Sequence, residues 1–262
     1  MDLNLREKHA LVCGSTQGIG RAVAMELAAL GANVTLLARN ATKLEAVKVA
    51  LPNDGSQTHS FFTADFARPS ELRESLAAWK ADAAPVHILI NNTGGPPGGP
   101  AHRADVEEFR TAFNQHLVCN HTLVQALLDD MKTAGYGRVI NVISTSVKQP
   151  LDNLGVSNTI RGAVANWAKT LANELGPHGI TVNNVLPGAT ATERLFSIIR
   201  NKAAKAGSTE AEAGDKMKKA IPAGRFAQPE EVAAAIAFLA SPAAAYINGI
   251  NLPVDGGRTR SL

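Results

Sequence analysis

A glycine-rich segment near the N-terminus has the residue types and spacing needed to hold a nucleotide. An apolar run at residues 9–13 precedes it, and an Ala-rich stretch of helical period follows it. Glycine lets the backbone turn tightly and approach a pyrophosphate, and the N–H groups that open the next helix bind its oxygens. Such a turn also occurs for steric reasons alone, but its place between a strand and a helix favours nucleotide binding. The segment consists of Gly14, Ser15, Thr16, Gln17, Gly18, Ile19 and Gly20.

The end of the second apolar run distinguishes the two nicotinamide dinucleotides. Residues 33–38 are followed by Arg39 and Asn40, and no acidic residue occurs between Ala32 and Glu45. An Asp or Glu here binds the ribose hydroxyls of NAD and repels a 2′-phosphate, whereas an arginine binds that phosphate through charge-assisted hydrogen bonds. The sequence therefore predicts NADP(H), and the alternative for Arg39 is a solvated surface arginine.

Alternating strand and helix patterns predict how these residues are positioned. Runs rich in Val, Ile and Leu occur at residues 9–13, 33–38, 58–63, 86–91, 138–144, 180–186 and 249–254. Helical periods fill the intervals at residues 18–30, 41–50, 69–80, 105–134, 156–175 and 229–239. Strands separated by helices of this length form βαβ units. We expect one α/β domain over residues 1–262, with a doubly wound parallel seven-stranded sheet and helices on both faces.

Composition and charge exclude several other classes of protein. The 262-residue chain is 45% hydrophobic and 19% charged, which rules out a disordered or fibrous protein. Its net charge of +3 includes no Lys/Arg block, so we expect no nucleic-acid partner. The charged N-terminus and the short apolar runs predict no signal peptide, no membrane association and a cytoplasmic location.

The two cysteines, Cys13 and Cys119, form no metal or disulfide pattern. They are too few for a disulfide framework and lack the Cys-x-x-Cys spacing of zinc or redox sites. His116 lies three residues before Cys119, but no third or fourth ligand is visible. We therefore predict no metal site.

Five stretches spread over nearly the whole chain resemble those of the short-chain dehydrogenase/reductase family. Besides the glycine-rich segment they are Asp65, Asn-Asn-Thr-Gly at residues 91–94, Pro-Gly-Ala-Thr-Ala-Thr at 187–192 and Asp-Gly-Gly at 255–257. Their common order and spacing carry the resemblance, which is to 3-oxoacyl-carrier-protein reductases in particular. Cys13 departs from the pattern because the family usually has Thr there. The resemblance implies a Rossmann fold and a nicotinamide cofactor.

By that resemblance, residues just beyond the other strands would complete the cofactor site. Ligands of open α/β sheets bind at this edge, and turn chemistry explains each stretch but not their shared edge. The implied residues are Asp65 and Phe66 for adenine, Asn92 and Gly94 for the ribose, and Pro187, Gly188, Thr190 and Thr192 for the nicotinamide carboxamide.

The catalytic residues of the family are only partly present. In the family a Tyr exchanges a proton with the substrate oxygen, a Lys four residues later lowers the pKa of the Tyr, and a Ser and an Asn support them. Ser144 and Asn114 match the last two, but Ser157 and Arg161 stand at the Tyr and Lys positions. A serine is a far weaker acid than a phenol, and an arginine stays protonated. Arg161 is thus suited to stabilising an oxyanion or holding an anionic group.

Two functions remain open at this point. The first is an NADP(H)-dependent oxidoreductase that acts on a small carbonyl or alcohol, with Ser144, Asn114, Ser157 and Arg161 as an altered polar site. Lys148, in the loop before the altered helix, is a further proton source to consider beside a solvated role. The second function is a cofactor-binding sensor or structural partner without turnover, which the loss of both Tyr and Lys favours.

The resemblance also carries expectations about a lid and about assembly. The segment at about 190–220 is polar, and in the family this region closes over substrate, so we expect a lid there. In the family the two long helices, here residues 105–134 and 156–175, form subunit interfaces. We therefore expect a homo-oligomer, either a dimer or a homotetramer.

Overall fold

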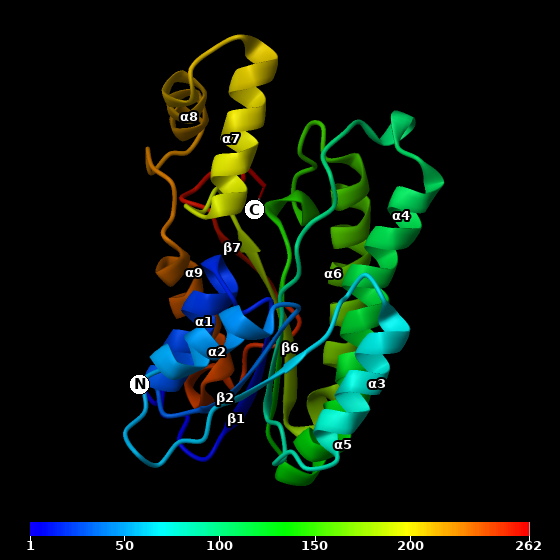
Figure 1. The fold of residues 1–262 in the computed structure, drawn as a ribbon, viewed down its shortest axis with the longest axis vertical. Coiled ribbons are helices and arrows are strands. Elements are labelled where there is room, and N and C mark those ends of the chain that lie inside the picture. Colours follow the sequence, from blue (N-terminus) through cyan, green and yellow to red (C-terminus); the bar gives the residue numbers. More distant parts are fainter. Residues whose placement is uncertain (262) are drawn as a thin grey trace.

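A parallel sheet runs through the centre of the computed structural model, which describes residues 1–261 (Figure 1). Within these residues the sheet has seven strands in the order β3-β2-β1-β4-β5-β6-β7. The predicted doubly wound Rossmann sheet is confirmed, and only strand ends differ; the strand expected from residue 58 begins at Ser60. The strands are β1 (His9–Cys13), β2 (Asn33–Ala38), β3 (Ser60–Thr63), β4 (Ile88–Asn91), β5 (Gly137–Val142), β6 (Ile180–Pro187) and β7 (Asn251–Val254).

Helices cover both faces of the sheet, with α1, α2 and α9 on one face and α3, α4, α5 and α6 on the other (Figure 1). Successive side chains of a strand point to opposite faces, so Val12 of β1 packs with the first layer and Leu11 with the second. This two-sided burial explains the continuous apolar runs in the sequence. These helices are α1 (Gly18–Ala29), α2 (Ala41–Ala50), α3 (Pro69–Lys80), α4 (Val106–Phe113), α5 (Cys119–Ala134), α6 (Gly155–Leu175) and α9 (Pro229–Ala240).

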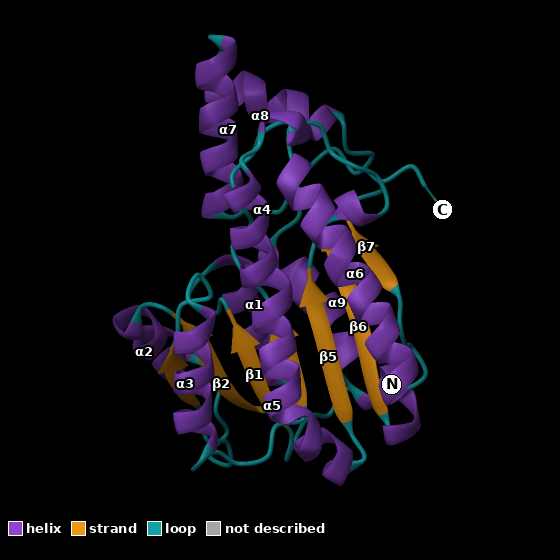
Figure 2. Ribbon diagram, turned by 90° about the vertical axis from the view of Figure 1, so that its right-hand side faces the viewer, coloured by secondary structure: helices purple, strands orange, loops and turns teal. Residues whose placement is uncertain are grey.

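The strand order reverses direction between β1 and β4, and this reversal positions the site. From β1 the chain winds outward to β2 and β3, whereas from β4 it winds the other way to β7. The loops that follow β1 and β4 therefore diverge and leave a crevice beyond the carboxyl ends of the strands. Figure 2 shows these ends pointing toward helices α7 (Glu193–Ala206) and α8 (Glu210–Lys219).

The long helix expected at residues 105–134 is interrupted. Helix α4 ends at Phe113, a π-helical turn covers Asn114–Val118, and α5 then begins at Cys119. A π-turn advances the chain by one residue more than an α-turn does, so it rotates the side chains that precede it relative to the apolar stripe of α5. This rotation decides which polar side chain of the segment is buried.

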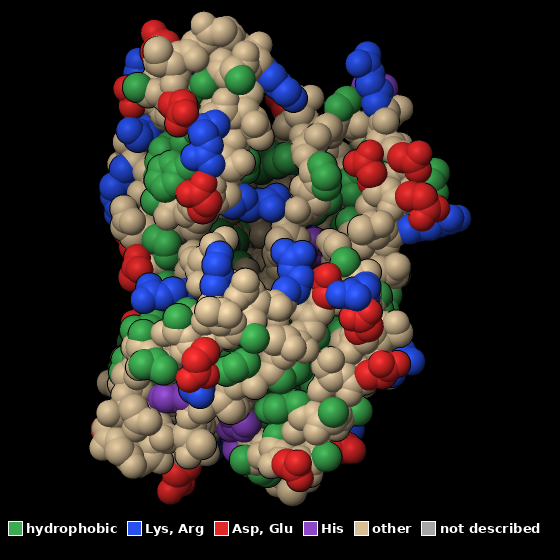
Figure 3. Space-filling view, in the orientation of Figure 1, with side chains coloured by type: hydrophobic (Ala, Val, Ile, Leu, Met, Phe, Trp, Pro, Cys, Tyr) green, Lys and Arg blue, Asp and Glu red, His purple; other side chains and the backbone are tan. Residues whose placement is uncertain are grey.

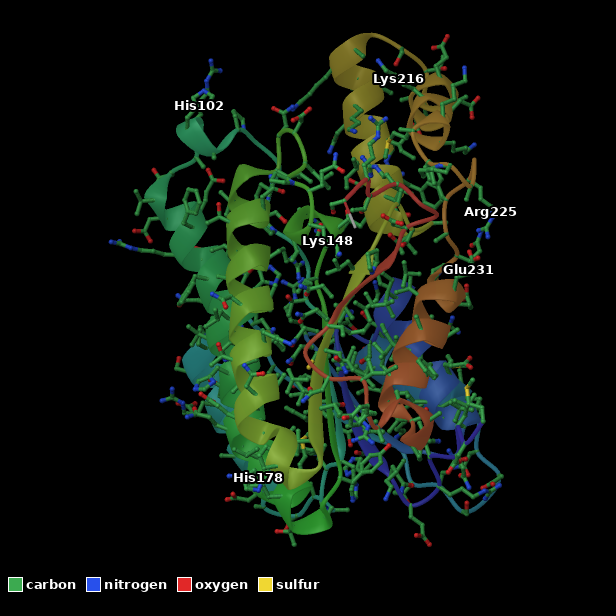
Figure 4. All side chains as sticks on the ribbon, turned by 180° about the vertical axis from the view of Figure 1, so that it is seen from behind. His102, Lys148, His178, Lys216, Arg225 and Glu231 are labelled. Carbon is green, nitrogen blue, oxygen red and sulfur yellow. The ribbon has the colours of Figure 1, made fainter. Side chains whose placement is uncertain are left out.

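The polar segment expected to be a lid contains two helices, which the sequence patterns had not predicted. Thr192 caps α7 by accepting a hydrogen bond from the N–H of Leu195, and Gly207 ends α7 in a left-handed conformation with φ 62°. Thr209 and Glu212 form a capping box at the start of α8. At the far end of the segment, Arg225 and Glu231 face each other at 2.6 Å (Figure 4).

Candidate active site

The glycine-rich segment forms a tight turn between β1 and α1, as predicted. Gly14 has φ 61° and Gly18 has φ 55°, a left-handed conformation that other residues rarely adopt. A Cβ at Gly20 would lie 2.2 Å from the carbonyl oxygen of Gly14, so the turn closes only because this position lacks a side chain. Gln17 makes no side-chain cap for α1, which leaves the first N–H groups of that helix available to a ligand.

One polar atom inside this turn has no partner. The Ser15 hydroxyl is buried and lacks a hydrogen bond to any residue in the part of the chain that the structure describes. Buried polar groups are normally satisfied, and an exception points to a bound ligand or water. The narrow turn, the uncapped helix and this hydroxyl together fit a phosphate-bearing cofactor. Thr16 and Ile19, also predicted for this site, lie half-buried in the same turn.

Contacts between loops bring the other predicted cofactor residues to the same edge. Asn92, after β4, donates its Nδ2 hydrogens to the carbonyl oxygens of Cys13 and Gly14 at 3.3 and 3.4 Å. A Cβ at Gly18 would lie 3.1 Å from Cγ2 of Thr192, so the turn after β6 faces the glycine-rich turn. The motifs that looked separate in sequence are therefore adjacent in space.

The turn after β6 is tied to the last strand. Gly188 packs against Asp255 so closely that a Cβ would lie 2.7 Å from the Asp255 Cα. Thr190 is buried, and its hydroxyl donates to the carbonyl of Gly188 at 3.3 Å. Pro187 ends β6 and Gly94 is exposed beyond β4, so both lie at the edge where the cofactor residues were expected.

Arg39 and Asp65 follow neighbouring strands at this edge. The N–H of Ala64 donates to the carbonyl of Ala38, which joins the ends of β2 and β3. Arg39 is exposed, and no carboxylate within residues 1–261 forms an ion pair with it. Asp65 accepts a hydrogen bond from Ala67, and the carbonyl of Phe66 accepts one from Cys119. The Arg39 guanidinium is thus available to an anion.

Three of the four predicted catalytic residues gather around the end of β5. Ser144 lies just beyond β5, half-buried, and its Oγ accepts a hydrogen bond from the N–H of Ser146. Arg161 of α6 is 8% exposed, and its Nη1 donates to the carbonyl of Val142 at 3.0 Å. Ser157 lies one turn earlier on the same face of α6 and is half-buried.

The structure does not bring Asn114 to this group. Asn114 is exposed and lines a shallow hollow together with Phe109, Phe113 and Ile160. Two residues later, His116 is 1% exposed, and its Nδ1 lies 2.6 Å from the hydroxyl of Thr93, which follows β4. The residue of this segment that reaches the site is therefore His116.

Burial and charge keep His116 neutral. Removal from water, together with the positive charges of Arg161 and Arg194, lowers the pKa of His116 to about 3. A sequence signal for its position exists, because His116 stands three residues before Cys119 and seven before Leu123, both buried. Asn114 falls outside that stripe.

Arg194, which the sequence did not single out, links the first turn of α7 to the loop after β4. Its guanidinium donates to the carbonyl of Gly95 at 3.0 Å and to that of Pro96 at 3.5 Å. Gly95 has no side chain, and a Cβ there would lie 2.6 Å from Nη2 of Arg194. One end of α7 is thereby tied to the loop that follows β4.

The two tyrosines of the chain, Tyr136 and Tyr246, lie elsewhere or have other contacts, and Lys148 lies in a loop. The Tyr136 hydroxyl donates to the carbonyl of Ala240 at 2.6 Å, and Tyr246 is fully exposed. Lys148 is half-buried in the loop between β5 and α6 (Figure 4). Among the described residues there is no group of three or more His, Cys, Asp or Glu side chains that could hold a metal ion, and no helix long and apolar enough to cross a membrane.

Comparison with known proteins agrees with this arrangement. A family model described as enoyl-(acyl carrier protein) reductase matches residues 14–259. The D-threitol dehydrogenase of Mycolicibacterium smegmatis is 34% identical over 98% of this chain and 95% of its own length. This chain belongs to the short-chain dehydrogenase/reductase family.

Other family members act on carbonyls and alcohols of several kinds. The gluconate 5-dehydrogenase of Gluconobacter oxydans is 33% identical over 99% of this chain and 97% of its own length. The L-sorbose reductase of Gluconobacter frateurii, solved with NADPH and L-sorbose, has 27% sequence identity, covers 100% of both chains and gives a TM-score of 0.93. The L-sorbose reductase therefore shares the overall fold of this chain.

Proposed function

We propose that this chain is an NADP(H)-dependent oxidoreductase that transfers a hydride to or from a small carbonyl or alcohol through an altered proton-transfer site. One observation carries the proposal: the glycine-rich turn is closed so tightly that a Cβ at Gly20 would lie 2.2 Å from the Gly14 oxygen, while the Ser15 hydroxyl inside it is buried and unpartnered. In a turn that served only close packing, this buried hydroxyl would have a hydrogen-bond partner in the protein. In a turn that binds a pyrophosphate, the pyrophosphate accepts its hydrogen bond.

The choice of NADP(H) over NAD(H) depends on Arg39. Arg39 follows β2, and its exposed guanidinium is suited to binding a 2′-phosphate. No acidic residue stands beside it to accept hydrogen bonds from the ribose hydroxyls of NAD(H). The solved L-sorbose reductase was obtained with NADPH, which supports the same cofactor here. A nicotinamide bound at this edge would supply or accept the hydride.

The chain's own residues then act on the substrate oxygen. In this proposal the Ser144 hydroxyl, just beyond the end of β5, orients that oxygen by a hydrogen bond. Burial and the neighbouring Arg194 lower the pKa of Arg161 to about 10, so the guanidinium stays charged at pH 7 and stabilises negative charge. It does not exchange a proton, and Ser157 is a very weak acid. Water relayed by Ser157 supplies the proton in this proposal.

The altered site predicts a slow enzyme. Losing a general acid lowers a rate by about 10²- to 10⁴-fold, which is about 3 to 5 kcal/mol of barrier. D-threitol, L-sorbose and gluconate are the first substrates to assay, because relatives are named for them.

Cofactor titrations test the binding half of this proposal. We expect fluorescence titration to show tight NADPH and weak NADH binding, and Arg39→Ala to weaken NADPH by roughly 10- to 100-fold, the loss of one charge-assisted hydrogen-bonded group. Arg73→Ala, an exposed arginine of α3, is the matched control and should change neither affinity. Equal binding of both cofactors by the native protein would contradict the role of Arg39.

The second candidate, a cofactor-binding protein without turnover, is favoured by Ser157 and Arg161 at the positions where the family has Tyr and Lys. Single-turnover oxidation of bound NADPH separates the two functions. Any carbonyl-dependent oxidation that Ser144→Ala reduces supports an enzyme. Turnover that appears only in the double variant Ser157→Tyr with Arg161→Lys supports the non-catalytic protein instead.

A further inference from the structure

The guanidinium of Arg161 is a buried positive charge without a negative partner. The side chain is 8% exposed, and its single hydrogen bond to the described part of the chain runs from Nη1 to the carbonyl of Val142. Its Nε is buried and has no hydrogen-bond partner in residues 1–261, and none of the ion pairs in that range includes this residue. Buried charges are normally paired, since removing an ion from water is strongly unfavourable.

A second arginine lies near the first and adds to the positive charge. Arg194 reaches from α7 to the carbonyls of Gly95 and Pro96, and its charge is close enough to oppose the protonation of Arg161. Both arginines also oppose the protonation of His116, whose Nε2 is buried and unpartnered among the described residues. Within the described residues, the charged side chains that shift the pKa values of Arg161 and His116 are arginines.

The charge of Arg161 lies at the edge of the sheet where the strands end, on the side where the proposed substrate would bind. Arg161 is bound to the strand residue two places before Ser144, and Arg194 belongs to the helix that stands above the crevice. Figure 3 shows Lys and Arg side chains gathered around the hollow at the centre of this face, below α7 and α8. The like charges of Arg161, which is buried, and Arg194 thus lie near each other, and no carboxylate of the described chain lies between them.

We infer that this site takes a substrate that carries a carboxylate, an oxo acid or a hydroxy acid, and that the carboxylate is bound between Arg161 and Arg194. This inference rests on the proposed function and names its substrate class. A planar guanidinium with a free Nε–H and Nη–H edge matches the two oxygens of a carboxylate. A neutral polyol would leave the buried charge uncompensated. The other anion available here is a phosphate of the cofactor, which the experiment must separate from a substrate carboxylate.

The test uses malonate as an unreactive carboxylate probe and malonamide as its neutral counterpart. Each is titrated by calorimetry into the full-length protein saturated with NADPH and into the cofactor-free protein. We expect malonate to bind at least ten-fold more tightly than malonamide. Arg161→Met and Arg194→Met should each weaken malonate by about 10- to 100-fold, the loss of a charge-assisted contact. The control variant Arg200→Met replaces an exposed arginine of α7, the helix that carries Arg194. It should leave the affinity for malonate unchanged.

Three results would overturn the inference while the cofactor still binds. They are equal affinity for malonate and malonamide, displacement of malonate by NADPH, and a loss of NADPH affinity in Arg161→Met as large as the loss of malonate affinity. The last two assign the guanidinium to a cofactor phosphate. Absence of NADPH binding with malonate binding intact would remove the proposed function but support the anion site. Arg194→Met gives an answer even if Arg161→Met does not fold, because Arg194 is exposed.

Discussion

Replacing Arg161 by methionine should make the ligand-free protein more stable. The guanidinium is removed from water and faces the charge of Arg194, and its one hydrogen bond goes to the carbonyl of Val142. Methionine fills a similar length of the α6 to β5 contact with apolar atoms and removes the unpaired charge. A residue that binds a ligand often lowers the stability of the empty protein in this way.

The magnitude follows from the pKa. Lowering the pKa of Arg161 from its ordinary value to about 10 destabilises the charged form by about 3 kcal/mol, at about 1.4 kcal/mol per pH unit. Since both values lie well above 7, the whole destabilisation is present at pH 7, and it is relieved only as the pH rises through 10. Loss of the hydrogen bond to Val142 offsets about 1 kcal/mol. The net gain is about 2 kcal/mol, or roughly 5 °C in Tm for a chain of this size.

Thermal and urea denaturation at pH 7, without cofactor, measure this gain. Arg200→Met is the matched control, because Arg200 is exposed on α7 and pairs with Glu193 on the surface. Its free energy of unfolding should match that of the native protein. With saturating malonate the order should reverse, as the native protein gains binding energy that the variant lacks. If, without ligand, Arg161→Met melts at or below the Tm of the native protein, the claim that the unpaired charge of Arg161 destabilises the protein is refuted.

Two further substitutions probe the other side chains of the site. The pKa of His116 falls to about 3 on folding, so below about pH 6.5 the unfolded chain binds one proton more than the native protein does. Between pH 7.5 and 5 the free energy of unfolding of the native protein should therefore fall by about 2 kcal/mol, a loss that His116→Gln should not show. Urea titrations at the two pH values check this, with His178→Gln, at the opposite end of the molecule (Figure 4), as control. Gly20→Ala should abolish NADPH binding in fluorescence titration because its Cβ would meet the Gly14 oxygen at 2.2 Å. Gly162→Ala, on open α6 surface, should bind NADPH normally, and a Gly20→Ala variant that binds equally well would contradict the close approach.

Much of the fold and of the cofactor edge could be predicted from local sequence. Apolar runs of strand length between helical periods predict a parallel sheet, and the residues that follow each strand then share one edge whatever their separation in sequence. The family resemblance assigned Asn92 and Thr192 to the cofactor site together with Gly18, and this shared edge agreed with it before their contacts were known. The homo-oligomer, the lid role of residues 190–220 and the cytoplasmic location stay predictions.

The catalytic group shows where local patterns stop. Helical spacing correctly relates Ser157 to Arg161, because i, i+4 geometry is a local property. The assignment of Asn114 assumed an unbroken helix, and the π-turn at Asn114–Val118 rotates that residue outward and His116 inward. Helices α7 and α8 were missed because their apolar stripes are narrow, although Thr192 and the Thr209–Glu212 capping box mark where they begin.

The sequence by itself determined the βαβ order, the glycine turn, Arg39 after the second strand and the i, i+4 pair of Ser157 and Arg161, which the family resemblance sets at the Tyr and Lys positions. Each depends on residue type and short-range spacing, which the printed chain contains. Tertiary structure alone decided that Arg161 is buried without a carboxylate partner among the described residues, and that Arg194 is near enough for its charge to act on Arg161. Burial and the distance between charges depend on how α6, α7 and the loop after β4 pack together. No short-range pattern specifies that packing. The packing creates the buried positive charge of Arg161, to which we assign the carboxylate of the substrate.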